Sequence, residues 1–188
     1  MSQGFDRDDT GFDRAKVVEL LTGLGRRLSA KGVAGRLYVV GGAAMALEFD
    51  TRRTTRDINA IFRPPTSVAD EAASMAADLG IPLGWLSAAA QAFIPLSDED
   101  PVSFDVEGLQ VAASSPANLL AMKMAAGRPQ DITDLVVLFR HLKIKSPEQA
   151  VDMAERMYGG DSVVLSEPRE SLLLLAESVL ARARRQGE

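Results

Sequence analysis

The feature that most constrains this chain is a strand-forming run that meets two glycines and then a helix-forming run. Residues 37–40 (LYVV) combine β-branched and aromatic side chains, which is typical of a buried strand. Gly41 and Gly42 follow at once, and residues 43–48 (AAMALE) favour a helix. The chain must therefore turn sharply from a strand into a helix, so the sequence predicts a fold that contains both kinds of element.

Periodicity and turn residues predict the remaining elements. The segment 85–96 is ambiguous, because it fits either a short helix or a loop packed by Trp85 and Phe93. Glu107 and Gly108 predict a hairpin between the two strands that flank them. We expect strands over 56–62, 102–106 and 109–112, and helices over 12–28, 67–79 (with Ser67 as N-cap), 116–127, from Pro129 onward, 146–158 and 170–185.

The composition limits the chemistry that this chain can perform. It has no cysteine and one histidine, His141, so thiolate sites and zinc sites with two histidines are excluded. Carboxylates, lysine, arginine or hydroxyl groups must carry any reaction. Lys and Arg number 21 against 26 Asp and Glu, a net charge of −5, which argues against a surface that coats nucleic acid but not against a local basic cleft.

Residues 1–14 are polar and rich in glycine and aspartate, with no apolar stretch of the kind found in signal peptides. No apolar run approaches the ~18 residues that a membrane-spanning helix needs. We therefore expect a cytoplasmic protein with no membrane partner.

The glycine pair and the strand that follows it suggest a site for phosphate and metal. Backbone amides at a glycine-rich helix N-terminus attract phosphate. On a strand, Asp57 and Asn59 would share one face, which suits Mg²⁺ ligands. A tight turn would also explain the glycines, and an ion pair with Arg52, Arg53 or Arg56 would also explain Asp57.

Residues 38–45 (YVVGGAAM) and 52–59 (RRTTRDIN) resemble the nucleotidyltransferase signature, a glycine pair followed by a T-x-D-x-D strand. Residues 85–95, 115–135 and 141–158 resemble the actinobacterial branch of nucleotidyltransferase-fold proteins related to abortive-infection (AbiEii-type) toxins. This resemblance implies an α+β fold, a small mixed β-sheet flanked by helices. It divides the chain into a flexible start (1–14), a nucleotidyltransferase-like core (15–113) and a helical C-terminal part (114–188) that completes the cleft.

The resemblance implies Mg²⁺-dependent transfer of a nucleotide from an NTP to an acceptor, which in related toxins can be a tRNA end. The residues alone favour a surface lysine with a buried stem at Lys123, and first-turn carboxylates favoured by the helix dipole at Asp131 and Asp134. The resemblance assigns nucleotide binding to Gly41, Gly42, Thr55, Arg56, Lys123, Arg128 and Asp131, and catalysis to Asp57, Asn59, Lys123 and Asp134.

One departure from the family pattern matters most: Asn59 stands where the signature has its second aspartate. An amide oxygen can ligate Mg²⁺ but brings no negative charge, so we expect weak metal binding and low activity. Three explanations of Asn59 remain open: natural loss of catalysis, a deliberate inactivating substitution, or a site completed by a further metal ligand. Asp105 is the candidate for that ligand.

The resulting hypotheses differ in class. The first is a weakened nucleotidyltransferase in a toxin–antitoxin or phage-defence setting, with a cognate antitoxin as its partner. The alternative is a catalytically degenerate module that binds a nucleotide or a partner, as an antitoxin would. A structural protein that dimerises through its C-terminal helices is a third hypothesis.

Overall fold

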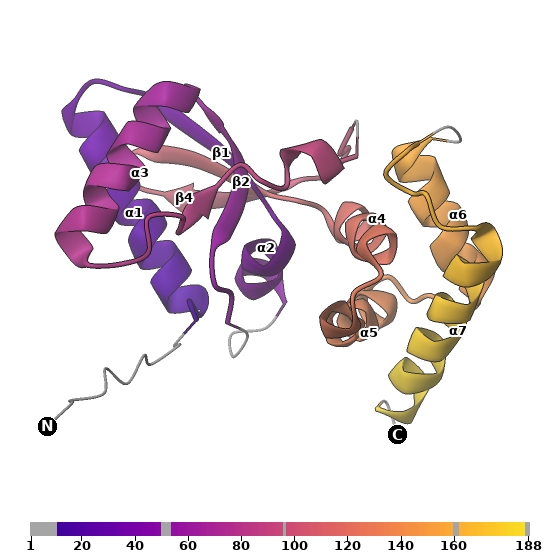
Figure 1. The fold of residues 1–188 in the computed structure, drawn as a ribbon. Helices are drawn as coiled ribbons and strands as arrows, with labels where there is room; N and C mark the ends of the chain where they lie inside the picture. The colour runs from indigo at the N-terminus through magenta and orange to yellow at the C-terminus, as the bar shows by residue number, and fades with distance from the viewer. Residues whose placement is uncertain (1–10, 50–53, 96, 160–161, 187–188) are drawn as a thin grey trace, which may run out of the picture.

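A computed structural model describes residues 11–49, 54–95, 97–159 and 162–186 and shows an α+β protein, as the sequence predicts (Figure 1). In chain order its elements are α1 (Arg14–Ala30), β1 (Gly35–Val40), α2 (Gly41–Glu48), β2 (Ile58–Arg63), α3 (Pro65–Leu79), β3 (Leu86–Ser87), the 3₁₀ helix η1 (Gln91–Phe93), β4 (Val102–Val106), β5 (Leu109–Ala113), α4 (Pro116–Ala126), the 3₁₀ helix η2 (Pro129–Asp131), α5 (Ile132–His141), α6 (Pro147–Tyr158) and α7 (Arg169–Arg185).

The five strands form one mixed sheet in the order β3-β2-β1-β5-β4. β1 runs antiparallel to β2 and parallel to β5, and β4 and β5 form the expected hairpin. Val40, the last residue of β1, pairs with Asn59 near the start of β2. The glycine turn that follows β1 therefore lies at the same edge of the sheet as Asn59.

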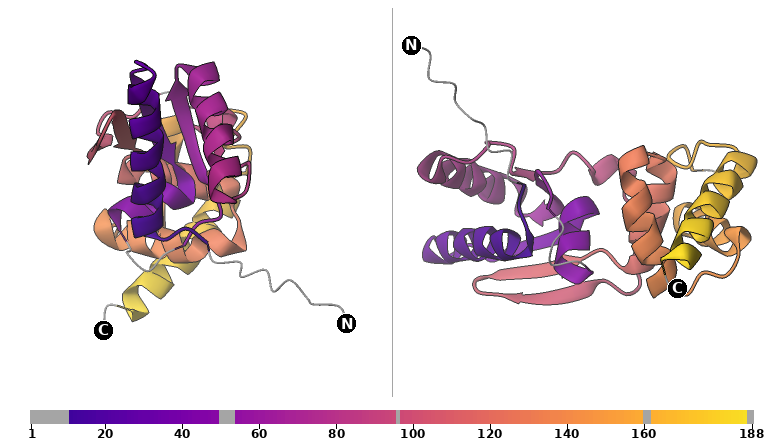
Figure 2. Two further views of the ribbon diagram at one scale, coloured as in Figure 1. Left: turned by 90° about the vertical axis from the view of Figure 1, so that its left-hand side faces the viewer. Right: turned by 90° about the horizontal axis from the view of Figure 1, so that it is seen from below.

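α1 and α3 lie side by side and cover one face of the sheet (Figures 1 and 2). Their apolar sides supply much of the core, including the fully buried Leu20 and Leu24 of α1. Helices α4 to α7 form a second, helical part beyond the ends of β1 and β5 (Figure 2). In the part of the chain that the structure describes, no helix is both long and apolar enough to cross a membrane.

Proline chemistry moves the start of two helices from the predicted positions, and α1 begins at Arg14 after its N-cap Asp13, not at residue 12. α3 begins at Pro65 after Pro64, so Ser67 lies inside the helix and is not its N-cap. Proline suits a first helical turn, because its missing N–H would have no partner there. Pro129 opens the 3₁₀ turn η2, and α5 begins only at Ile132.

The segments on either side of the site also differ from prediction. β2 begins at Ile58, so Asp57 precedes the strand. The ambiguous segment 85–96 contains β3 and η1. Trp85 is buried and donates a hydrogen bond from Nε1 to the carbonyl of Ala72 at 2.9 Å, whereas 56% of Phe93 is exposed. The sequence allowed a loop packed by both Trp85 and Phe93. In the structure only Trp85 of the two packs this segment.

Candidate functional site

A cavity of about 720 Å³ lies between one edge of the sheet and the helical part of the chain. This volume is in the range of sites that hold small molecules. Residues from the start of α2, the start of β2 and the segment before it, η1, α4, η2 and α6 line it together. Of the residues that the sequence proposed, the cavity brings together Gly41, Gly42, Thr55, Arg56, Asp57, Asn59, Lys123, Arg128 and Asp131.

The glycine turn presents the first turn of α2 to this cavity. Gly41 has a left-handed backbone (φ 65°), and Val40 before it provides no side-chain cap. The amide groups of a first helical turn have no partner within the helix, and together with the helix dipole they attract anions. This end of the cavity therefore has the features of a phosphate site.

Gly42 is required by a close approach to Thr55. A β-carbon at Gly42 would lie 2.7 Å from Oγ1 of Thr55, inside van der Waals contact. The same hydroxyl donates a hydrogen bond to the carbonyl of Asp57 at 2.9 Å, and the backbone of Thr55 forms a β-bridge with Phe12. Thr55 thus connects the glycine turn to the segment that carries Asp57.

Asp57 and Asn59 are half-buried and both line the cavity. The amide Nδ2 of Asn59 donates a hydrogen bond to Oδ1 of Asp57 at 3.1 Å. The bond orients the carboxylate and uses one of its acceptor positions. Arg56 is exposed beside them. The ion pairs suggested for Arg52 and Arg53 lie outside the described residues.

Lys123 forms a buried ion cluster with two aspartates from the next elements. Its Nζ lies 2.7 Å from Oδ1 of Asp131 and 2.6 Å from Oδ2 of Asp134. Only 5% of Lys123 and 2% of Asp134 are exposed, so Asp134 does not line the cavity and lies beneath the lysine. The two carboxylates more than balance the single ammonium charge, which makes Lys123 a link between α4, η2 and α5 more than a free cation for phosphate.

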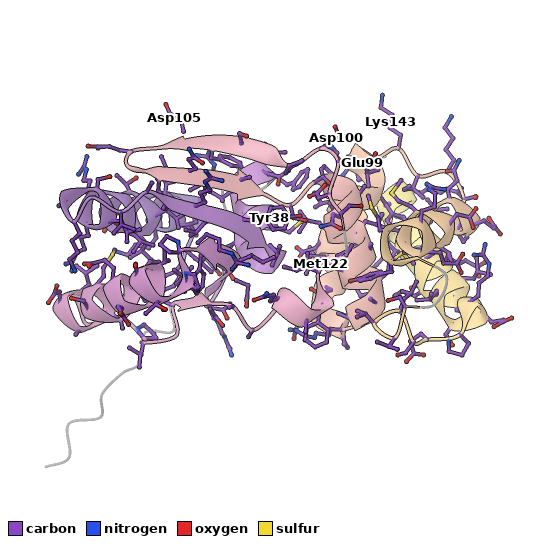
Figure 3. All side chains as sticks on the ribbon, turned by 90° about the horizontal axis from the view of Figure 1, so that it is seen from above. Tyr38, Glu99, Asp100, Asp105, Met122 and Lys143 are labelled. Atoms are coloured by element: carbon purple, nitrogen blue, oxygen red, sulfur yellow. The ribbon has the colours of Figure 1, made fainter. Side chains whose placement is uncertain are left out.

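Asp105 does not reach the cavity, which corrects its proposed role as a metal ligand. β4 runs antiparallel to β5 and pairs Asp105 with Gln110, which in turn pairs with Arg36 near the start of β1. This end of the sheet is opposite to the glycine turn. Figure 3 shows the Asp105 side chain pointing away from the molecule, whereas Met122 lies on α4 where the sheet meets the helical part.

The donor set tests whether the site could hold Mg²⁺. Among the described residues that line the cavity, the acids are Asp57 and Asp131, and Asp131 is paired with Lys123. Within the described ranges there is no cluster of three or more His, Cys, Asp or Glu side chains that could hold a metal ion by itself. Mg²⁺ is often held by one or two carboxylates together with substrate phosphates and waters. Asp57 and Asn59 therefore fit an ion that arrives with a nucleotide.

A polar network next to the cavity joins α4 to β1. The hydroxyl of Tyr38 donates to Oδ2 of Asp98 at 2.5 Å, and Nδ2 of Asn118 donates to that hydroxyl at 2.8 Å. Burial, together with the hydrogen bond to Asp98, raises the pKa of Tyr38. Burial and then the nearby charge of Asp98 raise the pKa of Glu48 to about 7. This network holds the start of α4 against the sheet.

Sequence reasoning missed the apolar lining of the cavity. Ala90, Phe93, Met122, Tyr158 and Val164 all contribute to it. They come from the segment after β3, from α4, and from the end of α6 and the segment after it. No local pattern marks them, because these segments meet only in the folded chain.

A mixed sheet whose glycine turn faces Asp57 and Asn59, closed by a helical part, defines a protein of the nucleotidyltransferase type. The family described as nucleotidyltransferase of unknown function (DUF6036) matches residues 19–158, and this chain belongs to it. No curated protein and no solved structure matches the chain.

Proposed function

We propose that this chain binds a nucleoside triphosphate and Mg²⁺ in the cavity and transfers the nucleotide slowly to an acceptor. One observation carries the proposal: the glycine turn before α2 and the pair Asp57 and Asn59 line the same cavity. The family to which the chain belongs supports the reaction class. In this reaction the acceptor oxygen replaces pyrophosphate on the α-phosphorus of the nucleotide.

Each side of the cavity has a part in this proposal. The amides of Gly41 and Gly42 would bind phosphate oxygens at the positive end of α2. Arg56 and Arg128 line the same cavity and would add positive charge toward the triphosphate. Asp57 would hold Mg²⁺, which supplies charge neutralisation when the phosphate bond breaks.

The low rate follows from the charge of the donor set. Asp57 is the one acid lining the cavity, among the described residues, that has no ion pair with Lys123. Asn59 contributes an oxygen without charge and directs its amide nitrogen to Asp57. Fewer negative ligands hold the metal less tightly and stabilise less charge in the transition state.

The experiment is incubation with Mg²⁺, each labelled NTP in turn and total tRNA. We expect slow label transfer by the wild type, faster transfer by Asn59→Asp and none by Asp57→Asn. The surface variant Glu19→Gln, in α1, is the matched control and should behave as the wild type. No transfer by either the wild type or Asn59→Asp would contradict the enzymatic function.

A second candidate function is nucleotide or partner binding without turnover, as in an antitoxin-like module. The ion cluster favours this second function. The ammonium of Lys123 is already paired with Asp131 and Asp134, so it is less available to stabilise phosphate charge during a reaction. Calorimetry with ATP and Mg²⁺ separates the two candidates. Binding to both the wild type and Asn59→Asp, with no transfer by either, is the result that selects this second function.

For the biological setting we propose a cytoplasmic toxin–antitoxin or phage-defence system related to AbiEii-type toxins, with a tRNA end as the acceptor and a cognate antitoxin as the partner. The resemblance of the chain to those toxins supports it. Arg140, Lys143, Lys145 and Arg184 also line one groove between α5 and α7, where phosphates of an RNA would find positive charge. Expression should arrest growth, and a small neighbouring reading frame should relieve the arrest; normal growth of the host would contradict the toxin role.

A further inference from the structure

The exposed ring of Phe93 distinguishes the cavity from an ordinary polar cleft. Phe93 is 56% exposed, and among the described residues every other Phe, Tyr and Trp is buried or half-buried. Its side chain lines the same cavity as Asp57 and Gly42. Its exposed ring lies in a cavity, so the face of the ring is available to a flat apolar group of a ligand.

The backbone beneath this ring is fixed. Within η1, the amide of Phe93 donates to the carbonyl of Ala90 at 2.9 Å. The carbonyl of Phe93 accepts a hydrogen bond from the hydroxyl of Tyr158 at 2.7 Å. Tyr158 is itself buried at the end of α6, and burial raises its pKa to about 12, so the hydroxyl remains a donor at neutral pH. The backbone that carries the ring is thus held in place before any ligand binds.

Part of the cavity lining is apolar. Ala90, Met122 and Val164 line the cavity with Phe93, and none of these side chains can donate or accept a strong hydrogen bond. The polar lining comes from the glycine turn and residues 54–59, and from Lys123, Arg128, Gln130 and Asp131. The cavity therefore offers charged and polar groups for phosphates together with apolar and aromatic side chains. A nucleotide needs both, because its phosphates are charged and its base is aromatic.

We propose that Phe93 is the platform on which the base of the bound nucleotide stacks. The inference rests on the proposed function for the presence of a nucleotide and adds the site of its base. Stacking uses the face of a base, which all bases possess, and it gains from ring area. The substrates are therefore both purine and pyrimidine triphosphates, with purines bound more tightly.

The test compares nucleotides with inorganic tripolyphosphate, which has the phosphates without the base. Calorimetry in the presence of Mg²⁺ measures the affinity of ATP, GTP, CTP, UTP and tripolyphosphate for the wild type and for Phe93→Ala. We expect Phe93→Ala to weaken ATP and GTP roughly 5- to 150-fold, from the usual contribution of one stacked base. Its affinity for tripolyphosphate should stay within about twofold of the wild type, because phosphate binding uses other residues.

Two further variants keep the result specific. Phe93→Trp should retain ATP binding and show quenching of the new indole fluorescence, since Trp85, the other tryptophan, is buried. Leu83→Ala removes another exposed apolar side chain (73% exposed) outside the cavity and should change neither affinity.

The outcomes separate this inference from the proposed function. Unchanged ATP affinity in Phe93→Ala, or an equal loss for ATP and tripolyphosphate, would overturn the stacking role while leaving nucleotide binding in place. If the wild type bound neither ATP nor tripolyphosphate, the proposed function would fail, and the stacking role with it.

Discussion

The amide of Asn59 donates a hydrogen bond to the carboxylate of Asp57 at 3.1 Å. A carboxylate at position 59 could not donate this bond and would instead place a second negative charge beside the first. The identity of residue 59 therefore decides whether this pair carries one negative charge, which accepts a hydrogen bond from its neighbour, or two, which repel each other in the absence of a cation.

Replacing Asn59 with Asp should make the stability of the protein depend on Mg²⁺. Without metal, we expect Asn59→Asp to be less stable than the wild type, because like charges repel. Bound Mg²⁺ should stabilise Asn59→Asp instead, raising its free energy of unfolding by about 2.7 kcal/mol at a concentration a hundredfold above its Kd. Thermal unfolding with and without Mg²⁺ measures it, with Asp57→Asn as the control that should not respond. Equal Mg²⁺ shifts in wild type and Asn59→Asp would refute the prediction.

Breaking the ion cluster around Lys123 should destabilise the protein strongly. Lys123→Met leaves Asp134 buried without its cation, which typically costs about 3–5 kcal/mol. The double variant Lys123→Met with Asp134→Asn should recover much of this loss. Urea unfolding gives the free energies. The exposed pair of Lys16 and Glu19 is the matched control, where Lys16→Met should cost at most about 1 kcal/mol. A similar small cost at Lys123 would show that the cluster is solvated.

The pKa of Glu48 predicts a loss of stability as the pH rises. Its folded pKa is about 7, raised from 4.5, so the folded state binds the proton more tightly than the unfolded state. The stabilising contribution is fully present below pH 4.5 and is lost as the pH rises through 7. Glu48→Gln should therefore unfold with a flatter pH dependence between pH 5 and 8. Denaturant unfolding across this range tests the slope, and parallel curves for the two proteins would rule this assignment out.

The two glycines of the turn should respond differently to substitution. Gly41→Ala meets no atom of the described residues within 4 Å but must adopt a positive φ, which costs about 1–2 kcal/mol. Gly42→Ala instead collides with Thr55, so its cost should shrink in a Thr55→Ala background while that of Gly41→Ala should not. Gly84→Ala, with open space and no positive φ, is the control. The unfolding free energies of the single and double variants measure this coupling. If the costs of Gly42→Ala and Thr55→Ala simply add in the double variant, the prediction is wrong.

The sequence by itself determined the elements that depend on near neighbours. The strand, glycine turn and helix at residues 35–48, the hairpin of β4 and β5, and the helices α4 and α6 all follow from local pattern. Each involves residues within a few positions of one another, where periodicity, turn chemistry and capping act directly. The Asp57 and Asn59 pair belongs here too, because two positions on one short segment share a face.

Only the tertiary structure decided which side chains meet across the chain. The antiparallel course of β4 places Asp105 at the far end of the sheet, although its carboxylate is a suitable metal ligand. Asp131 and Asp134 both turn to Lys123, and Phe93 faces the cavity of Asp57 while Trp85, eight positions earlier, is buried. These outcomes depend on strand pairing and on the packing of α4 to α7 against the sheet, which bring together segments that carry no local mark of one another.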